Sequence, residues 1–197
     1  MLPLCEPFHD AFTWAEQRRR QQLPELADDP AYRWHATHTV RALAHFRLKQ
    51  EDRLGGWKPS GNHSQNGALW FTDSRYRIRV LHALNESDVP PPGSSRTRRA
   101  FYSNPPLLAM PPLFGEPNDR LLVLWRIDPK TSAVGFRVMR PIGEWAWGAF
   151  QAADLDFMLP QTANELSHLA FEPHDDLGLD LPLDEEEGDT DAGGITG

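Results

Sequence analysis

The chain has 197 residues, 40% of them hydrophobic, and a formal net charge of −8. Its single cysteine, Cys5, excludes an intrachain disulfide and a multi-cysteine zinc site, and no apolar run reaches the roughly 18 residues that span a bilayer. Because the first residues also lack a basic segment followed by a long apolar one, we expect a soluble cytoplasmic protein without membrane contact.

Charge is divided unevenly along the sequence. All 20 lysines and arginines lie within residues 1–140, which carry a formal +6, whereas residues 141–197 hold 14 acidic side chains and carry −14. Such asymmetry favours a basic body that binds polyanions or acidic partners, with an acidic segment that competes or recruits. We predict a single globular domain over residues 1–172 and a disordered acidic tail over residues 173–197.

A first helix is predicted over residues 7–22. Phe8, Phe12 and Ala15 recur there at helical spacing, and Pro24 follows the pattern. A second helix is predicted between Pro30, which suits a first turn, and the glycine pair at residues 55–56.

The second predicted helix carries a line of aromatic and basic side chains at spacings of four, three, four and four residues: Trp34, His38, Arg41, His45 and Lys49. Aromatic and basic groups together favour single-stranded nucleic acid, because they stack bases and neutralise phosphates. The alternative is an ordinary solvated helix face with one packed tryptophan. The two histidines lie roughly 10 Å apart with no carboxylate between them, so no metal site is predicted.

Beyond a segment of loop composition, residues 55–67, the hydrophobic period changes to two and predicts strands over residues 68–71 and 75–84. Three arginines alternate with apolar residues in the longer strand: Arg75, Arg77 and Arg79. Residues two apart on one strand face stand roughly 6.5–7 Å apart, close to the repeat of phosphates in a nucleic-acid strand. The three arginines are therefore predicted to follow a nucleic-acid backbone. The alternative is that they pair with carboxylates or pack their aliphatic stems over a helix.

Residues 88–118 contain eight prolines and predict a long loop, which also carries Arg96, Arg98 and Arg99. A hairpin follows, with a central strand over residues 121–127, a turn at 128–132 and a partner strand over 133–142. An edge strand is predicted over residues 155–159 and a short helix around residues 162–171. The fold class is therefore α+β, with two N-terminal helices packed on an antiparallel sheet of four or five strands.

Alternating leucines precede the most acidic part of the tail: Leu177, Leu179, Leu181 and Leu183. In an extended chain such residues can pair with an exposed sheet edge of a partner or of the body. The alternative is a plain tail or a loosely packed final strand.

No phosphate-binding loop, nucleophile elbow or zinc-ligand spacing is present, so we predict no catalytic residue, metal or cofactor. The expected function is that of a small non-enzymatic binding protein, whose basic body contacts RNA, DNA or an acidic partner while its tail competes or recruits. One alternative is an adaptor, antitoxin-like or immunity-type protein that binds one protein partner without nucleic acid. Another is a small ribonuclease that uses Arg75, Arg77, His82 or His38.

Overall fold

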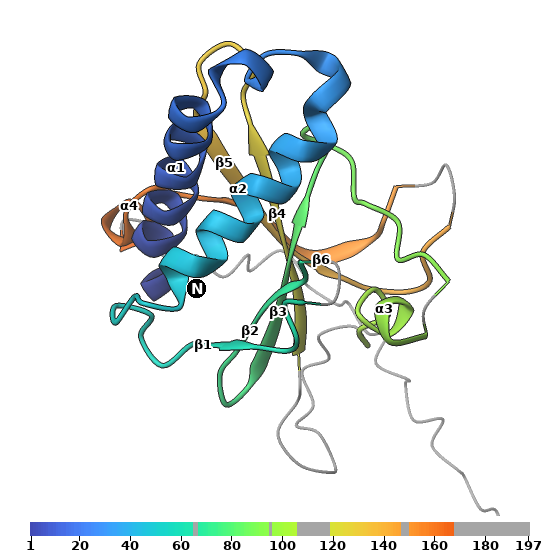
Figure 1. Ribbon diagram of the computed structural model, residues 1–197. Helices are drawn as coiled ribbons and strands as arrows, with labels where there is room; N and C mark the ends of the chain where they lie inside the picture. Colours follow the sequence, from blue (N-terminus) through green and yellow to red (C-terminus); the bar gives the residue numbers. More distant parts are fainter. Residues whose placement is uncertain (65–66, 95, 106–118, 147–149, 168–197) are drawn as a thin grey trace, which may run out of the picture.

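The computed structural model describes residues 1–64, 67–94, 96–105, 119–146 and 150–167 of the chain. In this part, two helices cover one face of a six-stranded sheet (Figure 1). The predicted acidic tail with its four leucines, and residues 106–118 of the proline-rich segment, lie outside the described residues.

The two predicted N-terminal helices are confirmed. Asp29 starts the second helical stretch, because its carboxylate accepts a hydrogen bond from the backbone N–H of Ala31 at 2.9 Å. That stretch ends at Leu48, short of the predicted glycine pair. In chain order the helical elements of this layer are η1 (Leu2–Leu4), α1 (Cys5–Gln22), η2 (Pro24–Leu26), η3 (Pro30–Tyr32) and α2 (Arg33–Leu48).

The strands lie side by side in the order of the sequence: β1 (Lys58–Ser60), β2 (Leu69–Thr72), β3 (Tyr76–His82), β4 (Asp119–Ile127), β5 (Val134–Pro141) and β6 (Ala153–Leu159). Pairing is antiparallel within β1–β3 and within β4–β6, but β3 and β4 are parallel. The predicted antiparallel sheet of four or five strands is therefore wrong in both strand number and direction.

Both errors have a physical reason. The missed strand β1 lies in the segment of loop composition, and its Pro59 is compatible with an edge strand, which needs only one side for pairing. The connection between β3 and β4 spans residues 83–118, long enough to return the chain to the same end of the sheet and so to allow a parallel pair.

The helices pack on the sheet through aromatic side chains. The Phe12 ring centroid lies 5.0 Å from that of Trp125 and 5.1 Å from that of Phe136, and Phe8 lies 5.1 Å from Phe71. Burial of these large rings between helix and sheet supplies much of the hydrophobic stabilisation of this layer.

The other face of the sheet is covered in part by the proline-rich connection. It contains a short helix, α3 (Arg96–Ala100), and the residues that follow, Phe101 and Tyr102, are buried with Leu122, Leu124 and Met139. The segment predicted as a long loop thus contributes a second, smaller core. This also explains why β4 is apolar on both faces.

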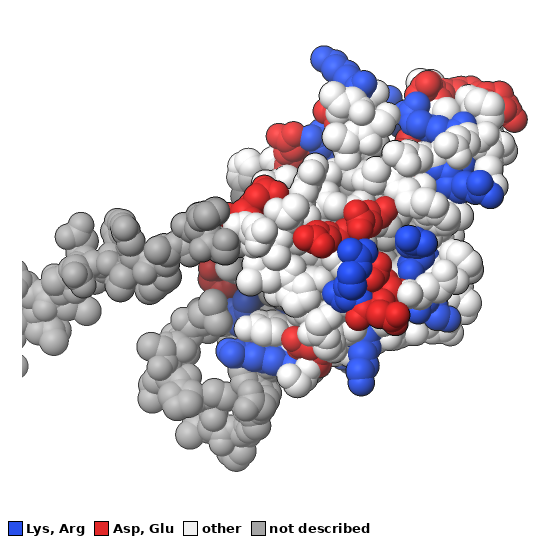
Figure 2. Space-filling view, turned by 90° about the vertical axis from the view of Figure 1, so that its left-hand side faces the viewer, with Lys and Arg blue, Asp and Glu red and all other residues white. Residues whose placement is uncertain are grey.

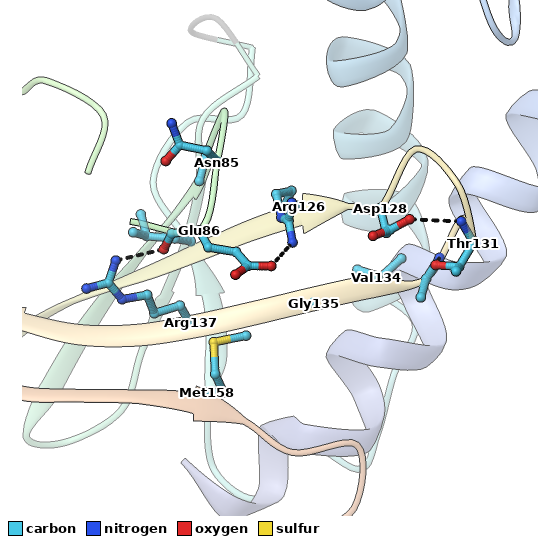
Figure 3. A pocket seen from close by; sticks show the side chains of 12 residues that line it. Asn85, Glu86, Arg126, Asp128, Thr131, Val134, Gly135, Arg137 and Met158 are labelled. Atoms are coloured by element: carbon cyan, nitrogen blue, oxygen red, sulfur yellow. Dashed lines mark hydrogen bonds and ion pairs between the residues drawn. The ribbon is translucent and has the colours of Figure 1, made fainter. Parts of the chain in front are cut away.

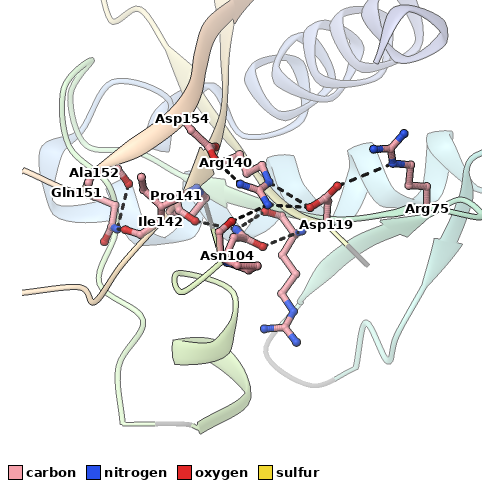
Figure 4. A network of polar contacts seen from close by, with 11 residues as sticks. Arg75, Asn104, Asp119, Arg140, Pro141, Ile142, Gln151, Ala152 and Asp154 are labelled. Carbon is pink, nitrogen blue, oxygen red and sulfur yellow. Dashed lines mark hydrogen bonds and ion pairs between the residues drawn. The ribbon is translucent and has the colours of Figure 1, made fainter. Parts of the chain in front are cut away.

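A buried polar network fastens this connection to the sheet (Figure 4). The Arg140 guanidinium donates to Asp119 at 2.8 Å and to the carbonyl oxygen of Pro105 at 2.9 Å, and it also pairs with Asp154. The Asn104 side chain donates to the carbonyl oxygens of Arg120 at 2.9 Å and Pro141 at 2.7 Å. These contacts fix the position of α3 relative to β4 and β5. The last described helix is α4 (Ala163–Ser167), where a short helix was predicted.

Candidate nucleic-acid interface

The arginines of the chain fall into two groups, according to whether a carboxylate accompanies them. Several arginines on the helix side are paired: Arg19 lies 2.8 Å from Glu16, and Arg53 lies 3.1 Å from Asp10 and 2.8 Å from Glu51. Figure 2 shows the side of the molecule on which α1 lies, where basic and acidic side chains are interspersed. This side therefore presents no continuous basic surface.

Part of the opposite sheet face is likewise neutralised. A hollow of about 210 Å³ lies there, and Figure 3 shows its arginines held by nearby oxygens. Arg126 pairs with the Glu86 carboxylate, while Arg137 pairs with Asp156 and donates to the carbonyl oxygens of Glu86 at 2.9 Å and Ser87 at 3.1 Å. Because these charges are already matched, the hollow has little to offer an anion.

The remaining part of that face differs. Arg77 and Arg79 of β3 point away from the helices, and the parallel pairing places Arg120 of β4 beside Arg77. In the part of the chain that the structure describes, none of these three arginines makes an ion pair with a carboxylate. Acidic side chains are thus concentrated elsewhere, and this region has a net positive charge.

Arg79 is the most unusual member of the group. Its side chain is only 8% exposed, and its Nη1 is buried without a hydrogen-bond partner among the described residues. Its guanidinium lies 5.1 Å from the centre of the Trp70 ring, which contacts Phe101 at 4.9 Å, and the Arg120 guanidinium lies 5.9 Å from Phe101. Two cations therefore accompany two aromatic rings, without an anion among the described residues.

Electrostatic repulsion adds to the cost of burying Arg79. Burial lowers its pKa, and the positive charges of Arg98 on α3 and Arg41 on α2 lower it further, while Tyr102 acts in the opposite sense. Burial raises the pKa of Tyr102 to about 12, so its phenol is neutral and supplies no counter-charge at neutral pH. An anion bound among these arginines would offset both desolvation and repulsion.

The predicted line on α2 reaches this region only in part. The Trp34 ring is 63% exposed and lies 6.5 Å from that of His38, whose Nδ1 is 3.0 Å from the Arg41 guanidinium. Arg41 lies half-buried against Gly67, where an added β-carbon would come within 3.0 Å of its guanidinium. The positive charge of Arg41 also lowers the pKa of Arg79, so the two guanidinium groups lie within electrostatic range of each other.

The far end of the line does not extend the basic surface in the same way. His45 stacks on His63 at 3.7 Å, and burial, together with His63 and Lys49, lowers its pKa to about 4, so it is neutral at pH 7. Lys49 lies beyond it, exposed after the last residue of α2.

The other predicted arginines divide between two places. Arg75 precedes β3 and lies 3.9 Å from Asp119, so it belongs with the Arg140 network rather than with Arg77. Arg96, Arg98 and Arg99 are exposed on α3, and Arg99 donates to the carbonyl oxygen of Gly93 at 3.3 Å.

We use the term arginine track for the arginines that lie on this face of β3 and β4, on α3 and at the adjoining position of α2: Arg41, Arg77, Arg79, Arg96, Arg98, Arg99 and Arg120. Sequence reasoning missed Arg120 and the two rings beside it, Trp70 and Phe101. The period of two in β2 indicates that Trp70 shares a face with Arg79, but the position of Phe101 depends on the course of the proline-rich connection.

No helix in the described part of the chain is long and apolar enough to cross a membrane. Among these residues, no group of three or more histidine, cysteine or acidic side chains is arranged to hold a metal ion. Comparison of the chain with protein-family models, with curated proteins and with solved structures found no match.

Proposed function

We propose that the protein binds single-stranded nucleic acid, with its phosphates on the arginine track. The observation that carries this proposal is Arg79, a buried guanidinium with other cations nearby and no anion beside it among the described residues. Buried charges in proteins are normally paired, and an unpaired one is costly. A phosphate supplies the charge and the acceptor oxygens that this site lacks.

The shape of the track supports an extended ligand over a compact one. Its members come from α2, β3, β4 and α3, and Arg77 and Arg79 stand two residues apart on one strand, at roughly the repeat of successive phosphates. Planar guanidinium groups bind phosphate oxygens through two parallel hydrogen bonds, which makes arginine well suited to this role.

Exposed aromatic surface at one end favours a single strand. Trp34 contacts His38, which in turn contacts Arg41. The exposed Trp34 ring can stack on a base that a duplex would keep paired. An acidic protein partner would match the charge of the track equally well but gives no role to this ring. Such a partner, bound without nucleic acid, is the competing outcome of the experiment below.

The test is fluorescence anisotropy with labelled RNA and DNA strands of about 20 nucleotides and with the corresponding duplex, at several salt concentrations. The variant replaces three exposed track arginines, Arg96, Arg98 and Arg99, by glutamine. We expect the affinity for single strands to fall ten-fold or more. The slope of log affinity against log salt should decrease by about 0.7 for each phosphate that the variant no longer binds.

The matched control removes the same charge elsewhere, by the changes Arg18→Gln, Arg47→Gln and Lys130→Gln. It should retain most of the wild-type affinity, because none of these three residues belongs to the arginine track. Equal reductions in both triple variants would indicate general charge attraction instead of a site. Absence of binding by the wild-type chain would overturn the proposal and favour a protein partner.

A further inference from the structure

A larger cleft, of about 760 Å³, lies where the end of α1 and the start of α2 meet the ends of β3 and β4. Tyr32, Arg33, Trp34, His82, Leu84 and Trp125 are among the residues that line it. None of these belongs to the arginine track.

The rim of the cleft is unusually apolar for a solvent-facing surface. Leu84 is 84% exposed, Trp34 63% and Tyr32 39%, and all three border this one cleft. Exposed apolar side chains gathered in one place indicate a binding site. Arg33, on the same rim, makes no ion pair in the described structure, whereas Arg20 is paired with Glu16 and Asp28.

One side chain that lines the cleft has a buried hydrogen-bond donor without an acceptor. Trp125 is 1% exposed and lines the cleft, yet its Nε1 has no hydrogen-bond partner among the described residues. Its ring makes an edge contact with the His82 imidazole, 4.6 Å between centroids. Buried indole N–H groups usually have a hydrogen-bond partner. A ligand with an acceptor atom in its ring would supply that partner to Trp125.

The cleft adjoins one end of the arginine track. Burial lowers the pKa of His82, and so does the positive charge of Arg41, the same arginine that acts on Arg79. Trp34, on the rim, leads to Arg41 through His38. These side-chain contacts join the rim of the cleft to Arg41, the track residue on the helix-covered side of the sheet.

We propose that this cleft receives one unstacked base of the single strand whose phosphates lie on the arginine track. The inference rests on the proposed function and adds a site for base recognition to it. The Trp34 ring stacks on the base, the Trp125 indole N–H donates to a base acceptor, and Arg33 binds the phosphate of the same nucleotide. Such a site would give the protein a preference among the bases, which phosphate contacts alone do not provide.

The direct test is NMR of the indole N–H signals, with the four nucleoside 5′-monophosphates as probes. The chain has seven tryptophans, and a Trp125→Phe variant identifies the signal of Trp125. We expect at least one monophosphate to shift that signal in the full-length protein, and the four to differ in affinity. A Trp34→Ala variant should bind the preferred monophosphate and the oligonucleotide roughly ten-fold more weakly, and Trp34→Phe should restore much of the affinity.

The matched control is Phe46→Ala, which removes another exposed aromatic ring of α2, 57% exposed, that is not among the residues lining the cleft. Suppose the oligonucleotide binds, no monophosphate shifts the Trp125 signal, and Trp34→Ala behaves like Phe46→Ala. The base site is then wrong and nucleic-acid binding by the track still stands. If neither oligonucleotides nor monophosphates bind, both proposals fail.

Discussion

The Arg79 guanidinium lies 5.1 Å from the ring centre of Trp70, its direct neighbour across the β2–β3 pair. No carboxylate accompanies this buried charge in the described part of the chain, so the ring supplies its main favourable contact. A cation–π contact contributes roughly 0.5–2 kcal/mol, whereas burying an ion costs several kcal/mol. Arg79 therefore reduces the stability of the unliganded protein.

Replacing Arg79 by methionine should separate stability from binding. We expect the midpoint of thermal unfolding to stay the same or to rise by about 2–4 °C, because a gain of about 1 kcal/mol has that effect in a chain of this size. Affinity for single-stranded oligonucleotides should fall at the same time. Calorimetry and anisotropy on the same preparation measure both, and a midpoint lowered by many degrees would show that Arg79 has a structural role.

Replacing Arg140 should instead lower the stability, because this buried arginine is paired with carboxylates. Its guanidinium contacts Asp119 and Asp154, so an Arg140→Met change removes the cation that both carboxylates share. Removing one partner of a buried pair typically costs about 3–5 kcal/mol. Urea unfolding should show this decrease, and a variant as stable as the wild type would contradict the structural role given to the network in Figure 4.

Stability should also decline on mild acidification because of His45. Its pKa is lowered from 6.5 to about 4 in the folded chain, so the unfolded chain takes up a proton first as the pH falls. The contribution of His45 to the free energy of unfolding is then fully present above pH 6.5 and is lost as the pH falls from about 6.5 to about 4. His9 and His82, whose pKa values are also lowered by burial, act in the same direction.

The contribution of His45 can be isolated with a His45→Gln variant. Its unfolding free energy should depend less steeply on pH in that window than that of the wild type. Parallel pH profiles for His45→Gln and the wild type would show that folding does not lower the pKa of His45.

Removal of residues 174–197 should strengthen nucleic-acid binding. Nine acidic side chains lie between Asp175 and Asp191, and under the proposed function we expect them to compete with phosphates for the arginine track. The gain should be larger at low salt, since charge attraction is screened beyond about 8 Å at physiological ionic strength. A tail of equal length with these nine residues changed to asparagine or glutamine separates charge from bulk. Equal, salt-independent binding by the shortened and full-length chains would disprove competition by the tail.

Local sequence patterns predicted the elements well and their arrangement poorly. The spacing of Phe8, Phe12 and Ala15 identified α1, and the alternation around Ile78 and Val80 identified β3. Both predictions succeeded because the buried face of a single element follows from the spacing of its own apolar residues. The direction of β4 relative to β3 depends on a connection of 36 residues, whose path no local period encodes.

The candidate site shows the same division. Alternation in β3 correctly put Arg77 and Arg79 on one face, but nothing local indicated that Arg75 would turn to Asp119. Arg41 and Arg79 belong to two separately predicted groups and are 38 residues apart in the sequence, yet the charge of Arg41 lowers the pKa of Arg79. Such proximity arises only from tertiary packing.

The parallel pairing of β3 with β4 has a consequence for how the binding surface forms during folding. Two antiparallel meanders, β1–β3 and β4–β6, meet only at this seam, and Arg77 and Arg120 lie on opposite sides of it. Each meander forms through contacts between residues close in sequence, which form quickly. Pairing of β3 with β4 requires closure of a long loop and is slower. A partly folded chain would therefore present two separate halves of the track, and only the completed sheet would bring them together.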